Sequence, residues 1–525
     1  MVMYELDHDT SPRLFLTCTS SPPDMQKIGQ TFVEYIMAED AIKDIPNSNG
    51  MRVMEKVPML ETGETRDIVI RDISEPFWQA CIDTCETENE RYRVCAVGTP
   101  GIGKSTNTPF LIRMLLKKGK TVVYLVRTEK EEGWYYEFIP SKDLSMTPTC
   151  NVYPESMDPD GIPSLLSPET YYIVDPGKTK DNCDPDNTFL PKVIIVASPD
   201  DRHWGESEFR KMRDGVKGFF LYYPLWKLEE LLSARSSLMD RGPQLSEDEI
   251  KKRYGEVGGV PRHTFVAEPN FKPILAAQVN AVNSLTLQQV ERIVGKEVDA
   301  VGMFSPSKPK SAVLGIMASD NFTVAKPVLI SKRVEEKIVD RFMHDLWSSV
   351  AMRGRGGWEV FEAYSRLLMV QREKTEFKCR PCVGLNDEQY TNVGKKRLGG
   401  CKEIQETSDI VMASIRSQGI LFHSSKQHQE LIDFIYQDDN NCFHAFQVTL
   451  GKKHNAKTKS IEKLKALVGD AKLSLYYMVM SDNFSTFVTN PVTPKGNGVS
   501  CWHVEVSKPD KVHGNGLMEQ PEMVE

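Results

Sequence analysis

Short apolar runs alternate with amphipathic segments through the first half of the chain. Five runs of four to six residues have the composition of buried strands, at residues 94–97, 121–126, 171–175, 193–198 and 219–223. Between these runs, residues 106–118 and 225–234 carry apolar side chains at helical spacing. Strands that alternate with helices predict an α/β fold with a doubly wound parallel sheet.

Weaker patterns outside these runs predict further elements. Residues 134–139 are apolar and aromatic, which predicts a strand at the edge of the sheet, whereas residues 140–168 are rich in Pro, Ser and Asp and predict a loop. A short strand is expected at residues 69–74. Helices are expected at residues 25–41, 76–90, 246–254, 277–294, 334–351 and 358–370.

The first apolar run leads into a glycine-rich loop and then into a helix. The loop has the pattern Gly98-x-x-x-x-Gly103-Lys104-Ser105, which is typical of a phosphate-binding loop in this setting. Its glycines allow a tight turn, so that backbone N–H groups and the helix N-terminus face a polyanion. Lys104 is expected to reach the β- and γ-phosphates, and the Ser105 hydroxyl to bind Mg²⁺. The candidate nucleotide-binding residues are Gly98, Thr99, Pro100, Gly101, Ile102, Gly103, Lys104 and Ser105.

Two residues downstream are candidates for the same site. Asp175 ends a buried strand, and a carboxylate at that end of a parallel sheet is expected to hold Mg²⁺ beside the loop. Arg262 follows a Gly-Gly-x-Pro turn, which would bring a cation to the phosphates or leave it in solvent. No second acid follows Asp175, so Glu129 is the candidate for a general base.

The second half of the chain has a different character after residues 354–357. Basic residues gather in an otherwise acidic protein, which predicts a nucleic-acid contact, although solvated lysines give the same pattern. These residues are Lys395, Lys396, Arg397, Lys452, Lys453, Lys457, Lys459, Lys463 and Lys465.

One predicted hairpin in this half carries polar residues at a meaningful spacing. Asp433 lies in the first strand, and Gln447 and Thr449 share one face of the second. This is the spacing of metal-dependent nucleases with a PD-(D/E)xK core, in which two oxygen ligands hold a divalent metal and a lysine supports the charge. Here glutamine and threonine replace the second acid and the lysine, and Lys453, His454 or Lys457 could supply the cation. An ordinary hairpin is the alternative.

Composition restricts the remaining possibilities. The 525 residues favour two to four domains, and 40% hydrophobic content with a net charge of -8 is ordinary for a globular protein. The 11 scattered cysteines, including Cys379 and Cys382, suit a reducing compartment better than a disulfide or zinc framework. We expect neither a membrane-spanning segment nor a signal peptide.

Six motifs, in the same order along the chain, together resemble one protein family. The sequence is similar to the Crinkler effectors of oomycetes and fungi and to the retrotransposon hot spot proteins of trypanosomes over roughly residues 90–490. The motifs are VGTPGIGKS at 97–105, YYIVDPGK at 171–178, IVASP at 195–199, YYPLWKLEEL at 222–231, YGEVGGVPR at 254–262 and FQVTLGKKH at 446–454.

The resemblance implies a P-loop NTPase of the STAND or AAA-like type, followed by a smaller α/β domain similar to restriction endonucleases. Nucleotide binding by Gly98–Ser105 and a lid position for Arg262 follow from it, with Mg²⁺ held by Ser105 and Asp175. A second metal would lie at Asp433, and the implied nuclease residues are Glu362, Asp433, Gln447 and a nearby cation, for which we choose Lys453. The expected regions are 1–90, unassigned; 91–275, NTPase with lid; 276–353, helical connection; 354–490, nuclease-like; and 491–525, a flexible tail.

Three functional hypotheses remain open at this point. The first is an NTPase, using ATP or GTP with Mg²⁺, that gates DNA cleavage. The second is a nucleotide-dependent switch that binds DNA or chromatin through a degenerate nuclease fold without cutting it. The third is an ATPase whose second half binds protein. For the first two we expect an intracellular, nuclear location, or secretion into a host nucleus, and an oligomer is compatible with all three.

Overall fold

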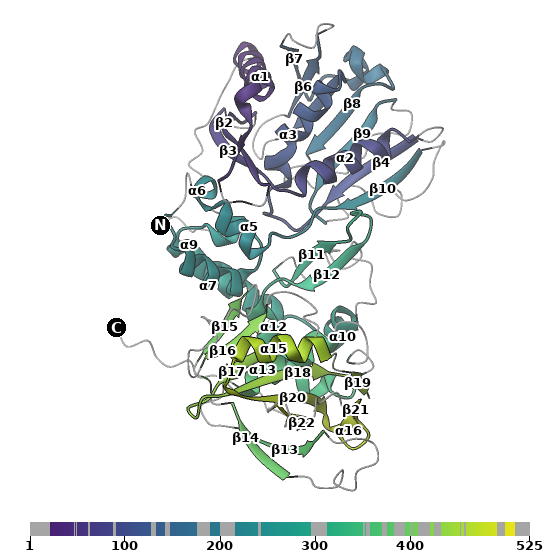
Figure 1. Ribbon diagram of the computed structural model, residues 1–525. Helices are drawn as coiled ribbons and strands as arrows, with labels where there is room; N and C mark the ends of the chain where they lie inside the picture. The colour runs from purple at the N-terminus through teal and green to yellow at the C-terminus, as the bar shows by residue number, and fades with distance from the viewer. Residues whose placement is uncertain are drawn as a thin grey trace, which may run out of the picture. The chain divides into compact units, whose positions relative to one another are not determined.

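The computed structural model divides the chain into two compact units (Figure 1). The first unit contains Met1–Ser284 and Val298–Val334, and the second contains Leu285–Glu297 and Glu335–Glu525. The structure describes residues 22–46, 48, 50–60, 63–87, 91–127, 133–141, 147–175, 190–199, 216–239, 243–295, 312–349, 352, 357–369, 375–382, 394–399, 401, 403–407, 420–424, 432–451, 453–455, 458–490 and 499–509.

A seven-stranded sheet forms the centre of the first unit. Its strand order is β10-β4-β9-β8-β5-β6-β7, and the five strands from β10 to β5 are parallel to one another. The last two strands are antiparallel. The bounds are β4 Arg91–Val97, β5 Val122–Val126, β6 Trp134–Ile139, β7 Thr149–Pro154, β8 Tyr171–Asp175, β9 Lys192–Ala197 and β10 Val216–Tyr222. The predicted α/β class with a parallel sheet is confirmed.

Two expectations for this sheet are wrong. The strand β6 is not at the edge, because β7 pairs along its outer side from Ile139↔Thr149 to Trp134↔Pro154. Residues 140–168 therefore contain a strand, followed by two 3₁₀ helices, η2 (Pro159–Gly161) and η3 (Pro163–Leu166). Polar loop residues hid these elements, since β7 has only one fully buried side chain, Cys150.

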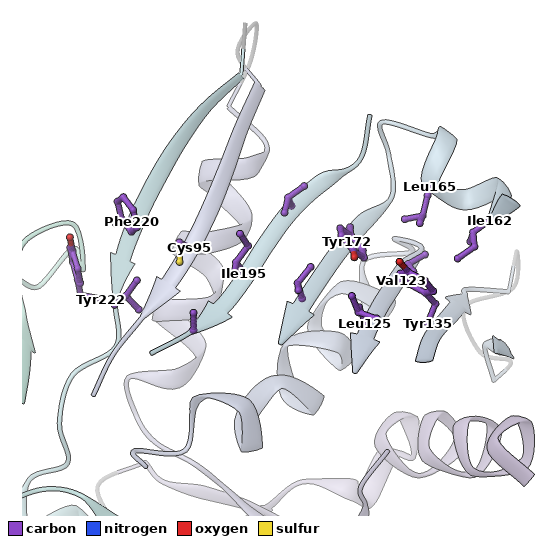
Figure 2. Close-up of a cluster of buried hydrophobic side chains, with 14 of the residues drawn as sticks. Cys95, Val123, Leu125, Tyr135, Ile162, Leu165, Tyr172, Ile195, Phe220 and Tyr222 are labelled. Atoms are coloured by element: carbon purple, nitrogen blue, oxygen red, sulfur yellow. The ribbon is translucent and has the colours of Figure 1, made fainter. Parts of the chain in front are cut away.

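Apolar side chains on one face of the sheet form a continuous core (Figure 2). Alternate residues of each strand enter it, for example Val123 and Leu125 of β5 and Tyr172 and Val174 of β8. Ile162 and Leu165, from the 3₁₀ segment, pack against the same face. The parallel strands are apolar over most of their length, as in β5, because both of their faces are covered.

Helices of the N-terminal part cover the sheet and its surroundings. The helix α2 (Ser74–Cys85) lies against β4 and β9, α3 (Lys104–Lys117) lies against β9 and β5, and α1 (Pro22–Met37) packs on β2 and β7 (Figure 1). After the 3₁₀ turn η1 (Glu39–Ala41), a small antiparallel sheet is formed by β1 (Lys43–Asp44), β2 (Arg52–Pro58) and β3 (Thr65–Ile70).

Buried hydrogen bonds tie this N-terminal part to the glycine-rich loop and its helix. The Trp78 indole donates to Asn107 Oδ1 of α3 at 2.8 Å, and Asn107 donates to the Val69 carbonyl at 3.0 Å. The Ser74 hydroxyl lies 2.8 Å from the Tyr223 hydroxyl. The described part of residues 22–87 therefore belongs to the first unit, although its sequence pattern assigned it no role.

Short helices and one hairpin complete the first unit. The hairpin consists of β11 (Leu314–Ala318) and β12 (Ala325–Leu329), paired in antiparallel fashion. The predicted helix at 277–294 is two helices, which end and begin on either side of Ser284. The helices of the first unit are α5 Leu228–Ser233, α6 Arg235–Leu238, α7 Glu247–Val257, α8 Pro261–Thr264 and α9 Glu268–Asn283. The helix α10 (Leu287–Gly295) belongs to the second unit, and α12 (Lys332–Leu346) begins in the first unit and continues in the second.

An eight-stranded mixed sheet forms the second unit, in the order β14-β13-β22-β20-β18-β17-β16-β15. The strands are β13 Thr375–Pro381, β14 Gly394–Leu398, β15 Glu403–Thr407, β16 Ile420–Ser424, β17 Phe434–Gln437, β18 Cys442–Thr449, β20 Lys472–Met480 and β22 Val499–Val506. The helices are α13 Gly357–Met369, α15 Thr458–Val468 and α16 Ser481–Phe484, and β19 Lys453–Asn455 pairs with β21 Val488–Asn490.

In the described residues of both units, no helix is both long and apolar enough to span a bilayer.

A buried arginine–histidine pair locks one part of this sheet. Arg380 Nε donates to His503 Nδ1 at 3.2 Å, and its guanidinium also donates to the carbonyls of Ser485 and Phe487. His503 is completely buried, and this burial, with the nearby Arg380 charge, lowers the pKa of its imidazole to about 3. The neutral ring is the form that accepts the arginine proton.

We expect the second unit to lose stability as the pH falls from about 6.5 towards 3, because of His503. In this range the imidazole binds a proton in the unfolded chain but not in the folded one. The free energy of unfolding therefore falls by up to about 1.4 kcal/mol for each pH unit of acidification. Urea unfolding of wild type and His503→Gln at pH 7.5, 6, 5 and 4 measures it. The variant should be less stable at pH 7.5 and should lose less stability than wild type on acidification. Equal slopes for the two proteins would contradict the assignment.

Candidate functional site

The loop between β4 and α3 depends on its glycines. Gly101 and Gly103 have φ angles of 83° and 90°, in the left-handed region that L side chains rarely adopt. At Gly98 the constraint is space, because a Cβ atom would lie 2.6 Å from the Tyr223 carbonyl oxygen. Gly103 is the residue that precedes the first turn of α3. The loop therefore turns tightly and delivers its backbone to the helix N-terminus.

Lys104 is buried inside this turn. Its ammonium donates to the carbonyls of Gly98 and Thr99, at 2.6 and 3.2 Å. Burial lowers the pKa of Lys104 to about 7; the Asp175 carboxylate opposes this shift and the Arg262 charge adds to it. Both residues therefore act electrostatically on Lys104. The structure brings together the loop, the acid at the end of β8 and the arginine of the Gly-Gly-Val-Pro-Arg segment.

The Gly-Gly-Val-Pro-Arg segment lies directly on the loop. The Arg262 N–H donates to the Gly101 carbonyl at 3.3 Å, and a Cβ on Gly101 would lie 3.0 Å from that of Arg262. Gly258 and Gly259 permit this approach, since a Cβ on Gly259 would meet the Trp226 carbonyl oxygen at 2.0 Å. The Arg262 side chain is exposed. This arrangement leaves its guanidinium accessible beside the loop.

Trp226 also holds the loop in place, a role that the sequence analysis did not predict. Its indole N–H donates to the Ile102 carbonyl at 2.8 Å, and its backbone N–H donates to the Gly259 carbonyl at 3.1 Å. Arg71 lies 4.9 Å over the indole ring and forms a buried ion pair with Glu230 at 2.8 Å. A tryptophan alone carries no site signal, and two of its partners, Ile102 and Arg71, are more than a hundred residues away in the sequence.

The donors at this site are suited to a polyanion with a bound cation. Backbone N–H groups at a helix N-terminus, Lys104 and Arg262 attract phosphate oxygens. The half-buried Ser105 hydroxyl and Asp175 carboxylate are hard oxygen ligands of the kind that Mg²⁺ prefers. Glu129, the candidate base, lies outside the described residues.

Asp433 and Gln447 meet in the second unit. Asp433 immediately precedes β17, and its Oδ2 accepts hydrogen bonds from Gln447 Nε2 at 2.8 Å and from the Val448 N–H at 2.6 Å. Burial raises the pKa of Asp433 to about 7, against the opposing effects of the Val448 hydrogen bond and the Arg366 charge. Gln447 Oε1 is buried and has no hydrogen-bond partner in the described part of the chain.

Glu362 lies on α13, where it is paired with Arg366 rather than left as a ligand. Arg366 Nη1 is 3.1 Å from Glu362 Oε1, and its Nη2 is 2.8 Å from Glu335 Oε2. All three side chains are largely buried. Among the described residues, Arg366, four residues after Glu362 on the same helix, is a cation that acts on Asp433, and the sequence analysis did not name it.

For the lysines predicted at this site, Lys452, Lys453 and Lys457, the structure describes the backbone at most. Lys453 begins β19, beyond the end of β18, and its side chain lies outside the described residues, as do Lys452, Lys457 and the His454 ring. Thr449 is buried, and its hydroxyl accepts from the Gly451 N–H at 3.2 Å. Of the other basic residues, Lys395 pairs with Glu376 at 2.7 Å, Lys465 donates to the Ala471 carbonyl, and Lys396 lies over the Trp502 ring.

The groups around Asp433 fit a divalent metal poorly. One carboxylate accepts two hydrogen bonds, the neighbouring amide turns its N–H₂ towards it, and Glu362 is neutralised by arginine. Within the described part of the chain, no group of three His, Cys, Asp or Glu residues could hold a metal ion. The unpartnered Gln447 oxygen is the one feature that invites a cation.

Comparison with protein-family models and with curated proteins found no match to this chain. The two sites are therefore interpreted from their own geometry.

We expect Gly98→Ala to destabilise the first unit more than Gly103→Ala does. Alanine at position 103 meets no atom within 4 Å and has only the left-handed backbone to accommodate, which costs about 1–2 kcal/mol. Alanine at position 98 collides with backbone, a kind of overpacking that costs about 1–3 kcal/mol or more. Chemical unfolding of the two variants measures the difference. A larger loss for Gly103→Ala would show that space at position 98 is not the constraint.

Proposed function

We propose that the first unit binds a nucleoside triphosphate, ATP or GTP, as a P-loop NTPase. The observation that carries this proposal is the convergence on Lys104, where the glycine turn, Asp175 and Arg262 meet. A buried ammonium that is bonded, among the described residues, to two loop carbonyls would gain stronger, charge-assisted hydrogen bonds from phosphate oxygens. Burial lowers the pKa of this ammonium group, and a bound polyanion would raise it again.

The strand order supports the finer assignment. Both β4, which leads into the loop, and β8, which ends in Asp175, are parallel, and only β9 separates them. Their carboxyl ends therefore lie at one edge of the sheet, which is where α/β sheets bind ligands. Mg²⁺ bound with the triphosphate would be held by Ser105 and Asp175 and would neutralise phosphate charge. Arg262 would bind and orient the terminal phosphate from the adjoining segment.

We expect Lys104→Ala to lose triphosphate affinity by about 100-fold. This corresponds to about 2.7 kcal/mol, within the range for hydrogen bonds to charged groups. Titration with a fluorescent ATP or GTP analogue in Mg²⁺ measures it. The matched control is Lys118→Ala, which removes an exposed lysine at the far end of the same helix and should leave the affinity unchanged. Wild-type protein that binds neither nucleotide would overturn the proposal.

For the second unit we propose a DNA-binding domain with a restriction-endonuclease-like fold of the Crinkler and retrotransposon hot spot kind. The pairing of a hairpin acid with the residue fourteen positions later supports that fold. The Asp433–Gln447 hydrogen bond favours binding over cleavage, because an amide N–H₂ occupies the carboxylate that a metal would need. DNA would be held by exposed basic side chains, such as Arg397 and Lys463. The protein is then a nucleotide-responsive DNA binder, and cleavage is the alternative outcome.

We expect wild-type protein to bind duplex DNA in a salt-sensitive way and to nick plasmid no faster than Asp433→Ala. The reason is that the site presents one hydrogen-bonded carboxylate of raised pKa to any metal. Gln447→Glu would add a second carboxylate, so this variant should bind Mn²⁺ measurably by calorimetry. Plasmid nicking by all three proteins in Mg²⁺ and Mn²⁺, with and without ATP, is the test. Nicking by wild type that Asp433→Ala abolishes would show a nuclease instead.

A further inference from the structure

The β11–β12 hairpin touches the candidate phosphate loop through a single buried hydrogen bond. The Ile316 N–H donates to the Thr99 hydroxyl at 3.0 Å, and both residues are almost completely buried. Ile316 also accepts a hydrogen bond from the Leu225 N–H at 3.0 Å. In the hairpin Ile316 faces Pro327, and both of its backbone groups bond outside the hairpin. The strand is thereby fixed to the loop on one side and to the segment after β10 on the other.

The tip of the hairpin is anchored at a second place. Tyr222, the last residue of β10, donates its N–H to the Phe322 carbonyl at 2.8 Å. The Phe322 ring meets the Phe77 ring edge-on, with centroids 5.3 Å apart. Phe322 holds a φ of 61°, an uncommon conformation for a bulky residue that surrounding contacts must maintain. Directly before the first anchor, Gly315 fits closely against Leu225, because a Cβ would lie 2.4 Å from its side chain.

A third contact joins the end of the hairpin to the segment that carries Arg262. A Cβ on Gly258 would lie 1.7 Å from the Ile330 carbonyl oxygen, so the two backbones are in direct contact. Arg333 lies 4.0 Å from Glu256 of α7. The chain then continues without a break into α12, the helix within which the first unit ends and the second begins, at Val334 and Glu335.

We propose that residues 312–334 form a strap that senses the nucleotide state of the loop and passes it to the start of α12. The strap contacts the two elements that a triphosphate would touch, namely the loop at Thr99 and the Gly258–Arg262 segment. This inference rests on the proposed nucleotide binding. The contact that senses the loop is the hydrogen bond from the Ile316 N–H to the Thr99 hydroxyl. This bond can form only when the loop backbone holds the Thr99 side chain towards the hairpin.

The coupling has a thermodynamic consequence. If the triphosphate favours the loop conformation that keeps the Thr99–Ile316 hydrogen bond, its binding stabilises the strap. Loosening the strap then lowers the affinity for the triphosphate by the same factor. Thr99 would thus have two roles: its backbone would face the phosphate, and its side chain contacts the strap. Neither role requires the Thr99 side chain to touch the nucleotide.

Hydrogen exchange of the full chain, read peptide by peptide, tests the strap. In wild type, saturating Mg·ATP should slow exchange both in the loop and in residues 312–331. Thr99→Val removes the acceptor but keeps the shape, and Thr99→Ser keeps the hydroxyl. With each variant saturated with ATP, protection of residues 312–331 should be lost in Thr99→Val and retained in Thr99→Ser.

A second variant acts from the side of the strap. Gly315→Val should push β11 away from Leu225 and raise the ATP dissociation constant, whereas Val324→Ser, at the exposed tip, should not change it. ATP binding without any change in residues 312–331 of wild type would overturn the strap and leave the proposed function standing. No binding of either ATP or GTP to wild type would overturn both.

Discussion

The first unit depends on a close approach of backbone to backbone around one buried ammonium group. Gly98 lies against the Tyr223 carbonyl, Gly259 against Trp226, and Gly258 against Ile330. Each approach excludes a side chain at the glycine. Lys104 lies beside the first of them, bonded to the carbonyls of Gly98 and Thr99. From the N-terminal part, Arg71 donates to the Leu225 carbonyl and so holds the segment next to Trp226.

Sequence patterns with short range predicted most of the central sheet. The buried strands are nearly continuous apolar runs, and β8 begins and ends where its pattern does, at Tyr171 and Asp175. The loop was readable because glycine, lysine and serine act there through local geometry. The strand β7 and the β11–β12 hairpin were missed, since their residues are mixed in character and are held by partners elsewhere. Trp226 and Arg71 were also missed, because each owes its role to residues distant in sequence.

The second unit shows the same division between local and distant information. Period-two alternation and a polar turn predicted the hairpin of β17 and β18, and the spacing of Asp433 and Gln447 placed them together. The pattern did not reveal which hydrogen bonds would form. The resemblance implied Glu362 as a nuclease residue, and in the structure Arg366, one helical turn later, pairs with it and also acts on Asp433. An i, i+4 pair is common on any helix, so only tertiary contacts distinguish this one.

Burial shifts the pKa of one ionisable group in each unit to near 7, and the consequences for ligand binding are opposite. The pKa of Lys104 falls to about 7, and that of Asp433 rises to about 7. Lys104 is still a donor without better partners than carbonyls, so an added anion would stabilise its charged form. Asp433 already accepts two hydrogen bonds, and a metal would have to compete with the Gln447 amide as well as with a proton. The same physical effect therefore favours an added anion beside Lys104 and opposes metal binding beside Asp433, which is why we propose nucleotide binding in the first unit rather than metal-dependent cleavage in the second.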